Sequence, residues 1–308
     1  MSAGVAGTVA ARRWLVTGAG GMLGQELVAM LQAREAAVTA VTRADLDITS
    51  PAAVTAAITG ARPEIVVNCA AWTAVDLAES QEAEALAVNG AGAANVAAGC
   101  AAAGARMIQV STDYVFDGEA SEPYPEGAEP GPATAYGRTK LAGEQAVRER
   151  LPDSAAIVRT AWLYGAHGAN FVATMIRLER ERDVVSVVDD QHGQPTSTIA
   201  LAEQIIALAG AQVPAGIYHA TCTGQTTWFG LARAVFRLAG ADPERVTPMA
   251  STRLSRPAPR PAYSVLGHDG WAAARLPPPA DWSAALNQAF PSILAKQPTS
   301  AEKCKPRP

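Results

Sequence analysis

A tyrosine and a lysine that can act together on a proton stand four residues apart, at Tyr136 and Lys140. The surrounding stretch, Ala135–Arg150, has the pattern of a helix, and residues four apart share one helix face. A tyrosine hydroxyl has a reference pKa near ~10, but a nearby cation stabilises tyrosinate and lowers that pKa. The pair is therefore a candidate for general acid–base chemistry at a carbonyl group. The alternative is a solvated helix face, because a Tyr-x-x-x-Lys spacing is common by chance.

Two hydroxyl side chains precede this helix at the end of a predicted strand. Met107–Val110 has the pattern of a strand, and Ser111 and Thr112 follow it directly. Either hydroxyl can hydrogen-bond the oxygen of a carbonyl substrate. We therefore take Thr112, or Ser111, as the third member of a candidate catalytic group with Tyr136 and Lys140.

A glycine-rich turn near the N-terminus indicates a dinucleotide site. The predicted strand Arg13–Thr17 runs into the sequence GAGGMLG, with glycines at Gly18, Gly21 and Gly24, and a predicted helix over Gln25–Ala33 follows. One glycine permits the tight turn, one lets the backbone approach a pyrophosphate, and one lets helix and strand pack closely, while free N–H groups at the helix start bind the phosphates. The spacing is G-x-x-G-x-x-G, so its place between a strand and a helix carries the interpretation. The alternative is a structural loop in another doubly wound protein.

The end of the second predicted strand, Ala37–Val41, indicates which dinucleotide is preferred. An acidic residue there would bind the ribose hydroxyls and repel a 2′-phosphate, whereas an arginine would attract one. The chain has Thr42 and Arg43 at this point, and Asp45 and Asp47 slightly later. We predict a preference for NADPH, with NADH open as a second cofactor. The alternative is that Arg43 is a solvated loop residue.

The order of these motifs favours catalysis over a solvated helix face. Reduction of a carbonyl group needs a hydride donor beside the carbon and a proton donor beside the oxygen. A nicotinamide dinucleotide on the glycine turn would supply the hydride. Lys140 can hold the nicotinamide ribose and also lower the pKa of Tyr136.

The elements that must position these residues alternate through the first half of the chain. Predicted strands lie at Arg13–Thr17, Ala37–Val41, Ile65–Asn68, Met107–Val110 and Ala155–Thr160, and predicted helices at Gln25–Ala33, Pro51–Thr59, Glu79–Ala103 and Ala135–Arg150. This rhythm predicts an α/β fold with a Rossmann-type, doubly wound parallel sheet covered on both faces.

The second half is less regular and predicts a smaller C-terminal α/β lobe that binds substrate. Helices are expected at Phe171–Arg182, Ile199–Ala209 and Trp228–Ala239, a strand at Val184–Val188, and mainly loops over Pro243–Pro279. We place the dinucleotide-binding domain at residues 9–188 and the substrate lobe mainly at 189–296, with some interleaving of segments. The tails, 1–8 and 297–308, are expected to be mobile.

Composition excludes several classes of function. The chain has 308 residues, 49% hydrophobic and 18% charged, and a formal net charge of -4. This balance gives no general attraction to nucleic acid or to an anionic membrane. We find no apolar run long enough to span a bilayer, no secretion signal, and no metal spacing among the four cysteines and four histidines, so a cytoplasmic protein is expected.

Longer stretches of the chain carry a family resemblance. They are TGAGGMLGQEL, DLDIT at 45–49, VVNCAAWTAVDLAES at 66–80, VSTDYVFDG at 110–118, AYGRTKLAGE at 135–144, RTAWLYG at 159–165, NF at 170–171, DDQHGQPT at 189–196 and RPAYSVL at 260–266. With them, the sequence resembles the dTDP-4-dehydrorhamnose reductase family of extended short-chain dehydrogenases/reductases. The resemblance runs from about Trp14 to about Phe290.

The resemblance implies roles for the motif residues. Thr112, Tyr136 and Lys140 would be the catalytic trio, with Tyr136 as the proton donor. The cofactor would be bound by Gly18, Gly21, Met22, Leu23, Gly24, Thr42, Arg43, Asp47, Ile48, Ala71, Trp72, Thr73, Tyr136 and Lys140, with Gly21 to Leu23 at the pyrophosphate and Asp47 and Ile48 at the adenine.

Substrate would be bound by Thr112, Asp113, Trp162 and Arg260. An indole can stack on the apolar side of a sugar ring, so Trp162 suits a sugar; a tryptophan of the core or the domain interface is the alternative. Arg260 can bind diphosphate oxygens in bidentate fashion, or it is an ordinary surface charge. Asn89 either orients Lys140 through water or has a buried polar or capping role.

The activity that the resemblance implies is NAD(P)H-dependent reduction of the C4 keto group of dTDP-4-dehydro-L-rhamnose to dTDP-L-rhamnose, the last step of dTDP-rhamnose synthesis. The alternatives are reduction of a related dTDP-4-ketodeoxysugar and a catalytically silent NADP-binding regulatory subunit, as in methionine adenosyltransferase. Some family members form homodimers through magnesium on surface carboxylates. No such set is identifiable in this sequence, so the metal is left unassigned.

Overall fold

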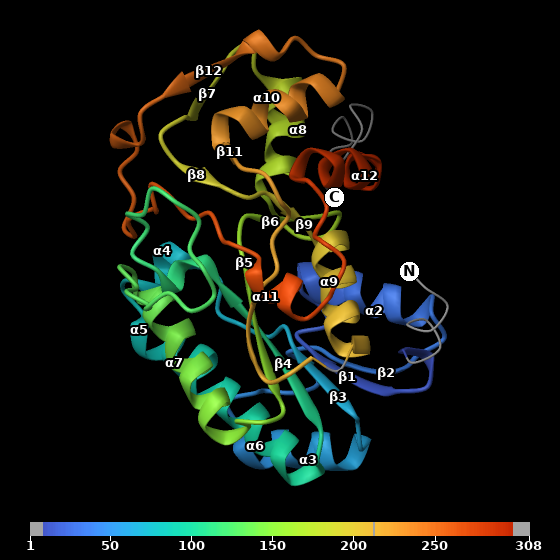
Figure 1. Ribbon diagram of the computed structural model, residues 1–308. Helices are drawn as coiled ribbons and strands as arrows, with labels where there is room; N and C mark the ends of the chain where they lie inside the picture. The colour runs from blue at the N-terminus through green and yellow to red at the C-terminus, as the bar shows by residue number, and fades with distance from the viewer. Residues whose placement is uncertain (1–8, 212, 298–308) are drawn as a thin grey trace, which may run out of the picture.

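A six-stranded parallel sheet forms the centre of the protein, in a computed structural model that describes residues 9–211 and 213–297. The sheet has the strand order β10-β5-β4-β3-β1-β2, and every neighbouring pair is parallel. Its strands are β1 (Arg13–Thr17), β2 (Ala37–Val41), β3 (Ile65–Asn68), β4 (Arg106–Thr112), β5 (Ala155–Thr160) and β10 (Gly216–His219). The order reverses between β1 and β3, and open α/β sheets bind ligands at such a point. The predicted Rossmann-type fold is thus confirmed (Figure 1).

Helices cover both faces of the sheet, because successive strand side chains point to opposite sides. Trp14 and Val16 of β1 pack on one side, whereas Leu15 between them packs on the other. One face is covered by α2 (Met22–Gln32) and α9 (Thr198–Ala211), and the other by α3 (Pro51–Ala61), α6 (Ala93–Ala103) and α7 (Ala135–Arg150). Strands that are buried on both sides explain the nearly continuous apolar runs in the sequence.

The long helix predicted at Glu79–Ala103 begins at Glu82 and runs without interruption to Ala103, through α5 (Glu82–Leu86), a π-helical segment (Ala87–Gly92) and α6. A separate short helix, α4 (Val75–Ala78), precedes it. The π-helical segment lies against α7, where a methyl group on Gly143 would collide with the backbone oxygen of Asn89. This contact joins segments that are far apart in the sequence, so no local periodicity predicts the π-helical segment. Such π-bulges are frequent at functional sites.

The stretch Glu82–Ala103 also corrects our expectation about membrane-spanning segments. It is long and apolar enough to cross a bilayer by length and composition, but half of its apolar window is buried inside the protein. Val96, Ala97 and Cys100 pack in the core beneath the sheet. Such burial is typical of a core helix.

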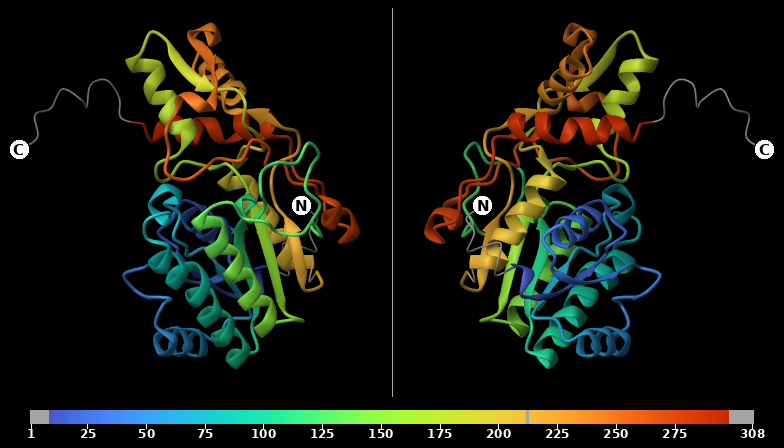
Figure 2. Two further views of the ribbon diagram at one scale, coloured as in Figure 1. Left: turned by 90° about the vertical axis from the view of Figure 1, so that its left-hand side faces the viewer. Right: turned by 90° about the vertical axis from the view of Figure 1, so that its right-hand side faces the viewer.

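A second lobe lies above the carboxyl ends of the strands (Figures 1 and 2). Its core is shared by α8 (Phe171–Glu181), β7 (Val185–Val188), α10 (Trp228–Leu238), β12 (Val246–Met249) and α12 (Trp282–Ala295). Short elements complete this half: β6 (Leu163–Tyr164), β8 (His192–Gly193), β9 (Thr196–Ser197), β11 (Thr226–Thr227) and α11 (Asp269–Ala273), with 3-10 turns at Asp113–Val115, Pro243–Arg245 and Ser251–Arg253. The region 243–279, predicted as mainly loops, thus contains β12, which pairs in parallel with β7.

Segments of the two lobes interleave around the division predicted at residue 188. The elements α8 and β7 precede that residue but pack in the upper core, whereas α9 and β10 follow it and belong to the sheet layer. The chain crosses between the lobes because β10 pairs with β5. Of the tails predicted to be mobile, residues 1–8 and 298–308 lie outside the described residues.

A buried ion pair attaches α7 to the sheet. Glu144 of α7 accepts hydrogen bonds from Nε and Nη2 of Arg159 on β5 at 2.9 and 2.7 Å. The two side chains are only 2% and 1% exposed. The guanidinium also lies 5.0 Å from the ring centroid of Phe116. The pair fixes the height of α7, and with it Tyr136 and Lys140, over the strand ends.

Breaking one side of this pair should destabilise the protein. Arg159→Met leaves the Glu144 carboxylate buried without its cation, and we expect a loss of about 3–5 kcal/mol in the free energy of unfolding. The double variant Glu144→Gln with Arg159→Met carries no charge at these two positions and should recover part of that loss. Urea unfolding measures both. Equal destabilisation in the single and double variants would contradict the role of charge burial.

Candidate active site

One cavity of about 960 Å³ lies at the carboxyl ends of the sheet strands β1 to β5. It brings together residues that are far apart in the sequence. Among its lining residues are Gly18, Gly21, Met22, Leu23, Gly24, Thr42, Arg43, Asp47, Ile48, Ala71, Trp72, Thr73, Thr112, Asp113, Tyr136, Lys140 and Trp162. Every residue predicted for the site except Arg260 therefore borders this space.

The glycine turn has the shape that a dinucleotide requires. Gly18 has φ +64°, and a methyl group on it would lie 2.6 Å from the backbone nitrogen of Ala70. A methyl group on Gly24 would meet Ala19 Cα at 2.8 Å. Both positions accept only glycine, which lets β1 turn tightly into α2. The N-terminus of α2 opens onto the cavity through Met22, so its free N–H groups can bind a phosphate.

The two aspartates that follow β2 accept hydrogen bonds from neighbouring threonines. Asp45 accepts hydrogen bonds from the backbone N–H and the hydroxyl of Thr42, at 2.9 and 2.7 Å. Asp47 accepts equivalent bonds from Thr49 at 2.9 and 2.8 Å. Arg43 is exposed at the edge of the cavity and makes no hydrogen bond or ion pair with the rest of the described chain. Its guanidinium is therefore available to a ligand.

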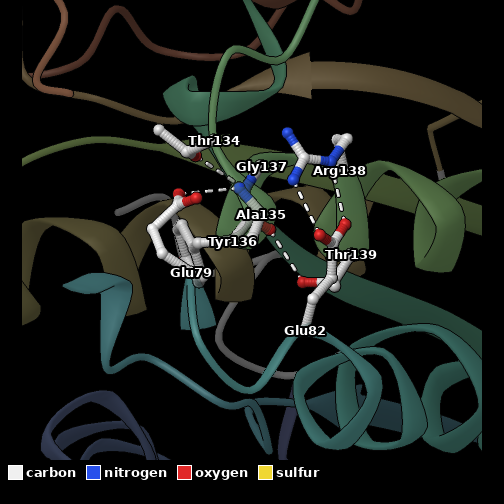
Figure 3. A network of polar contacts seen from close by, with 8 residues as sticks. All are labelled: Glu79, Glu82, Thr134, Ala135, Tyr136, Gly137, Arg138 and Thr139. Carbon is white, nitrogen blue, oxygen red and sulfur yellow. Dashed lines mark hydrogen bonds and ion pairs between the residues drawn. The ribbon is translucent and has the colours of Figure 1, made fainter. Parts of the chain in front are cut away.

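The start of α7, which carries Tyr136, is fixed by three contacts (Figure 3). Thr134 caps the helix by accepting from the backbone N–H of Gly137 at 3.0 Å. Glu79 accepts from the backbone N–H of Ala135 at 2.9 Å. Arg138 forms a bidentate pair with Glu82 of α5, with bonds of 2.8 and 2.7 Å. Helix caps and charge-assisted bonds of this kind hold the first turn, and so the phenol, in one place.

The Lys140 ammonium group is buried one turn further along α7. It donates a hydrogen bond to the backbone oxygen of Val110 at 2.7 Å. Burial lowers the pKa of Lys140 to about 8, although the nearby Glu144 carboxylate and Cys69 act in the opposite direction. Lys140 thus has donor capacity left for a ligand.

The pKa of Tyr136 does not behave as the sequence suggested. Burial and the charge of Asp113 raise this pKa, while hydrogen bonding with Thr112 lowers it. No effect of Lys140 on this pKa is resolved in the ligand-free protein, where the ammonium group donates to the Val110 carbonyl. In this conformation Tyr136 stays protonated, which is the form a proton donor needs. The expected lowering of its pKa by Lys140 is wrong here.

Asp113 is a buried carboxyl beside the phenol. Its Oδ1 accepts a hydrogen bond from Thr112 at 2.9 Å, and its Oδ2 has no partner among the described residues. Burial raises the pKa of Asp113 to about 6, against hydrogen bonds from Thr112 and Ser264 that lower it. An unpaired buried oxygen is costly, so Oδ2 is suited to a hydroxyl of a bound ligand.

Thr160 is a cavity residue that the sequence analysis missed. It ends β5, and strand register pairs it with Thr112 of β4. The Oγ1 atom of Thr160 and the Oγ atom of Ser111 are both buried without a hydrogen-bond partner in the described structure. Both residues line the cavity. The rule that ligands bind at strand carboxyl ends would have indicated Thr160.

Asn89 fixes the wall of the cavity after β3. Its side chain accepts from the backbone N–H of Trp72 at 2.8 Å and donates to the backbone oxygen of Trp72 and to Thr139, both at 3.1 Å. The amide is thereby used in joining the Trp72 loop, the π-helical segment and α7. Of the alternatives for Asn89, the structure shows the buried polar role.

Two substrate residues are placed differently from our expectation. The indole of Trp162 stacks on Trp228, with ring centroids 3.5 Å apart and an interplanar angle of 3°, and Gly193 lies against the same indole. Its predicted stacking face is therefore covered. Arg260 forms a bidentate pair with Asp76 at 2.9 and 2.8 Å, and it borders a separate hollow of about 230 Å³. Neither the indole packing nor this ion pair could be predicted from local sequence.

No metal site is evident in residues 9–211 and 213–297, where no group of three or more His, Cys, Asp or Glu side chains could hold an ion. The magnesium suggested by the family resemblance therefore has no support in this part of the chain.

Comparison with known proteins agrees with the geometry. The family model described as "RmlD substrate binding domain" matches residues 12–294. The chain is 59% identical over 288 residues to a Streptomyces griseus protein named dTDP-4-dehydrorhamnose reductase, covering 92% of this chain and 95% of that one. It is 54% identical over 287 residues to the dTDP-4-keto-6-deoxy-D-glucose reductase of Streptomyces niveus, covering 92% and 99%.

A solved structure gives the same result. The dTDP-4-dehydrorhamnose reductase of Bacillus anthracis in complex with NADP superposes with a TM-score of 0.87 at 39% identity, covering 91% of this chain and 98% of that one. The chain therefore belongs to the family described as the RmlD substrate binding domain, the family of the dTDP-4-dehydrorhamnose reductases.

Proposed function

We propose that this protein uses NADPH to reduce the C4 keto group of dTDP-4-dehydro-L-rhamnose, giving dTDP-L-rhamnose. The observation that carries the proposal is one cavity bordered at one side by the glycine turn and at the other by Thr112, Tyr136 and Lys140. The names of relatives at 59% and 48% identity support the same activity. A catalytically silent subunit would not need all three of these side chains.

The residues of the chain divide the chemistry between them. NADPH, when bound, would supply the hydride for the sugar C4. Tyr136 gives its proton to the carbonyl oxygen, and its raised pKa keeps that proton in place until charge develops on the oxygen. Ser111, whose hydroxyl has no partner in the described structure, can donate a hydrogen bond to the same oxygen, whereas Thr112 would first have to turn its hydroxyl proton away from Asp113. Lys140 holds the ribose of the cofactor and provides positive charge near the tyrosinate that forms.

Cofactor choice is assigned to Arg43. Asp45 and Asp47 are bonded to Thr42 and Thr49, whereas Arg43 has no such partner in the described chain. A 2′-phosphate can therefore form hydrogen bonds with the arginine, although the nearby Asp47 carboxylate also attracts its charge. NADPH is the proposed cofactor, and use of NADH stays a prediction, as does a homodimer.

A second candidate is reduction of a related dTDP-4-ketosugar. Relatives named dTDP-4-keto-6-deoxy-D-glucose reductase and probable dTDP-4,6-dihydroxy-2-methyloxan-3-one 4-ketoreductase are 54% and 51% identical to the chain. These substrates differ in ring substituents rather than in the reacting carbonyl. A panel of dTDP-4-ketosugars, with kcat/KM measured for each, decides between the candidates.

Turnover should depend on the phenol of Tyr136. With dTDP-4-dehydro-L-rhamnose and NADPH, the absorbance of the reduced cofactor should fall with time. Tyr136→Phe removes the proton donor, so kcat should fall about 10²–10⁴-fold while NADPH still binds. Thr139→Ser, on the same helix turn, is the control and should keep most of the activity. Full activity in Tyr136→Phe would refute the assigned acid.

Removing the Arg43 guanidinium should change cofactor selectivity. Arg43→Ala should lower kcat/KM for NADPH roughly 10- to 100-fold, since a charge-assisted hydrogen bond contributes about 1.5–3 kcal/mol. The value for NADH should change little. If both cofactors lose equally, Arg43 acts on the loop rather than on the 2′-phosphate.

The buried ammonium group should give stability a pH dependence of known sign. The pKa of Lys140 is lowered to about 8 in the folded protein from 10.5. Between those values the unfolded chain binds more protons, so the wild type should gain stability as the pH rises from about 8 to about 10.5. Lys140→Met lacks this gain. Urea unfolding of both proteins across that pH range tests this prediction. If the difference in unfolding free energy between wild type and Lys140→Met does not change with pH, burial of the Lys140 ammonium group is contradicted.

A further inference from the structure

The indole of Trp162 occupies a narrow slot in the upper lobe. One wall of this slot is Trp228, the first residue of α10, whose ring lies parallel to Trp162 with centroids 3.5 Å apart. At that separation the two rings are in van der Waals contact across their faces. Trp162 itself follows β5, so it reaches from the sheet into the upper lobe.

Gly193 forms the other wall. A methyl group added to Gly193 would come closest to Cε2 of Trp162 and would lie 2.6 Å from each of the two atoms bonded to it, Cζ2 and Nε1. If the added methyl carbon lay in the ring plane, beside the edge of the indole, it would be nearer to Cζ2 and Nε1 than to Cε2. It is nearest to Cε2 and therefore lies above the ring plane. Trp228 atoms are not among its nearest neighbours. The glycine therefore covers the face of Trp162 opposite to Trp228.

The two walls belong to one structural unit. Gly193 of β8 pairs with Thr226 of β11, and β11 leads directly into Trp228. Phe171 of α8 also contacts the Trp228 ring, with ring centroids 4.7 Å apart and an interplanar angle of 51°. A displacement of the paired strands β8 and β11 would move both walls of the slot, Gly193 and Trp228, together.

The backbone of Trp162 is strained, and the slot stabilises it. Trp162 has φ +47°, in the left-handed region that bulky residues avoid. Such conformations persist only where surrounding structure determines them, and they cluster at ligand sites. With Trp228 stacked on one face and Gly193 over Cε2 on the other, Trp162 is left to present its edge to the cavity that it lines.

We infer that Trp228 and Gly193 are positioning residues for the reductase, which clamp Trp162 so that its indole edge, and not its face, meets the nucleotide-linked sugar. This inference rests on the proposed function, from which the identity of the sugar is taken. Neither clamp residue lines the cavity, so each acts through Trp162. Only a glycine at 193 leaves room for the ring.

The test compares Trp228→Ala with Phe229→Ala. Phe229 is the next residue of α10 and packs at the same core, but its ring faces Arg233 and not Trp162. Both variants lose an aromatic ring. Trp228→Ala should lower kcat/KM for the ketosugar about 10- to 100-fold, as misplacement of a substrate-contacting group does. Phe229→Ala should lower it far less, and the Kd for NADPH should stay unchanged in both.

Two milder variants separate positioning from folding. Trp228→Phe keeps a flat ring against Trp162 and should restore most of the kcat/KM lost in Trp228→Ala. Gly193→Ala removes no apolar surface and should still reduce kcat/KM selectively for the ketosugar. Wild-type kcat/KM in Gly193→Ala, or equal losses in the Trp228→Ala and Phe229→Ala variants, would overturn the clamp.

Circular dichroism distinguishes failure of the clamp from failure of the proposed function. Two stacked indoles couple their transitions, so the wild type and Phe229→Ala should share an exciton signal that Trp228→Ala lacks, with or without turnover. Persistence of the signal in Trp228→Ala would contradict the stack. A wild type that shows the signal but reduces no dTDP-4-ketosugar would contradict the proposed function and leave the clamp supported.

Discussion

The site depends on placing a buried ammonium group and a phenol on one turn of α7, over the end of β4. The Lys140 ammonium is costly to bury, and its one hydrogen bond to the Val110 carbonyl leaves donor capacity for a ligand. The helix that carries it is fixed at its start by Thr134 and Glu79 and further along by the Glu144–Arg159 pair. The fold thus maintains an arrangement that is unfavourable locally and useful for catalysis.

Electrostatics around the phenol keep its proton on the hydroxyl before a ligand binds, although a raised pKa also makes the phenol a weaker acid. Asp113 and burial raise the pKa of Tyr136, so the hydroxyl keeps its proton in the ligand-free protein. The positive charge of Lys140 matters once negative charge develops on the phenol oxygen during the reaction. Asp113, with one carboxyl oxygen unpartnered among the described residues, offers a hydrogen-bond acceptor in the same cavity. The proposed acid, cation and acceptor thus border a single cavity.

The sequence predicted the parts of the structure that depend on short-range patterns. The glycines at 18, 21 and 24, the spacing of Tyr136 and Lys140, and the alternation of strands and helices each reflect local geometry. What it could not predict depends on contacts between distant segments. The pairing of β10 with β5, the Arg260–Asp76 ion pair and the covered faces of Trp162 are all of this kind. The π-helical segment likewise follows from close packing on Gly143.

The central claim is that Tyr136 delivers the proton to the sugar C4 oxygen. A crystal structure of the protein with NADP⁺ and dTDP-L-rhamnose tests it most directly. The account predicts the Tyr136 hydroxyl within about 2.5–3.0 Å of the sugar O4, in the range of an O–H···O hydrogen bond. It also predicts the Lys140 ammonium at the nicotinamide ribose. A sugar bound with its O4 turned away from residue 136, toward some other acidic group, would contradict the account.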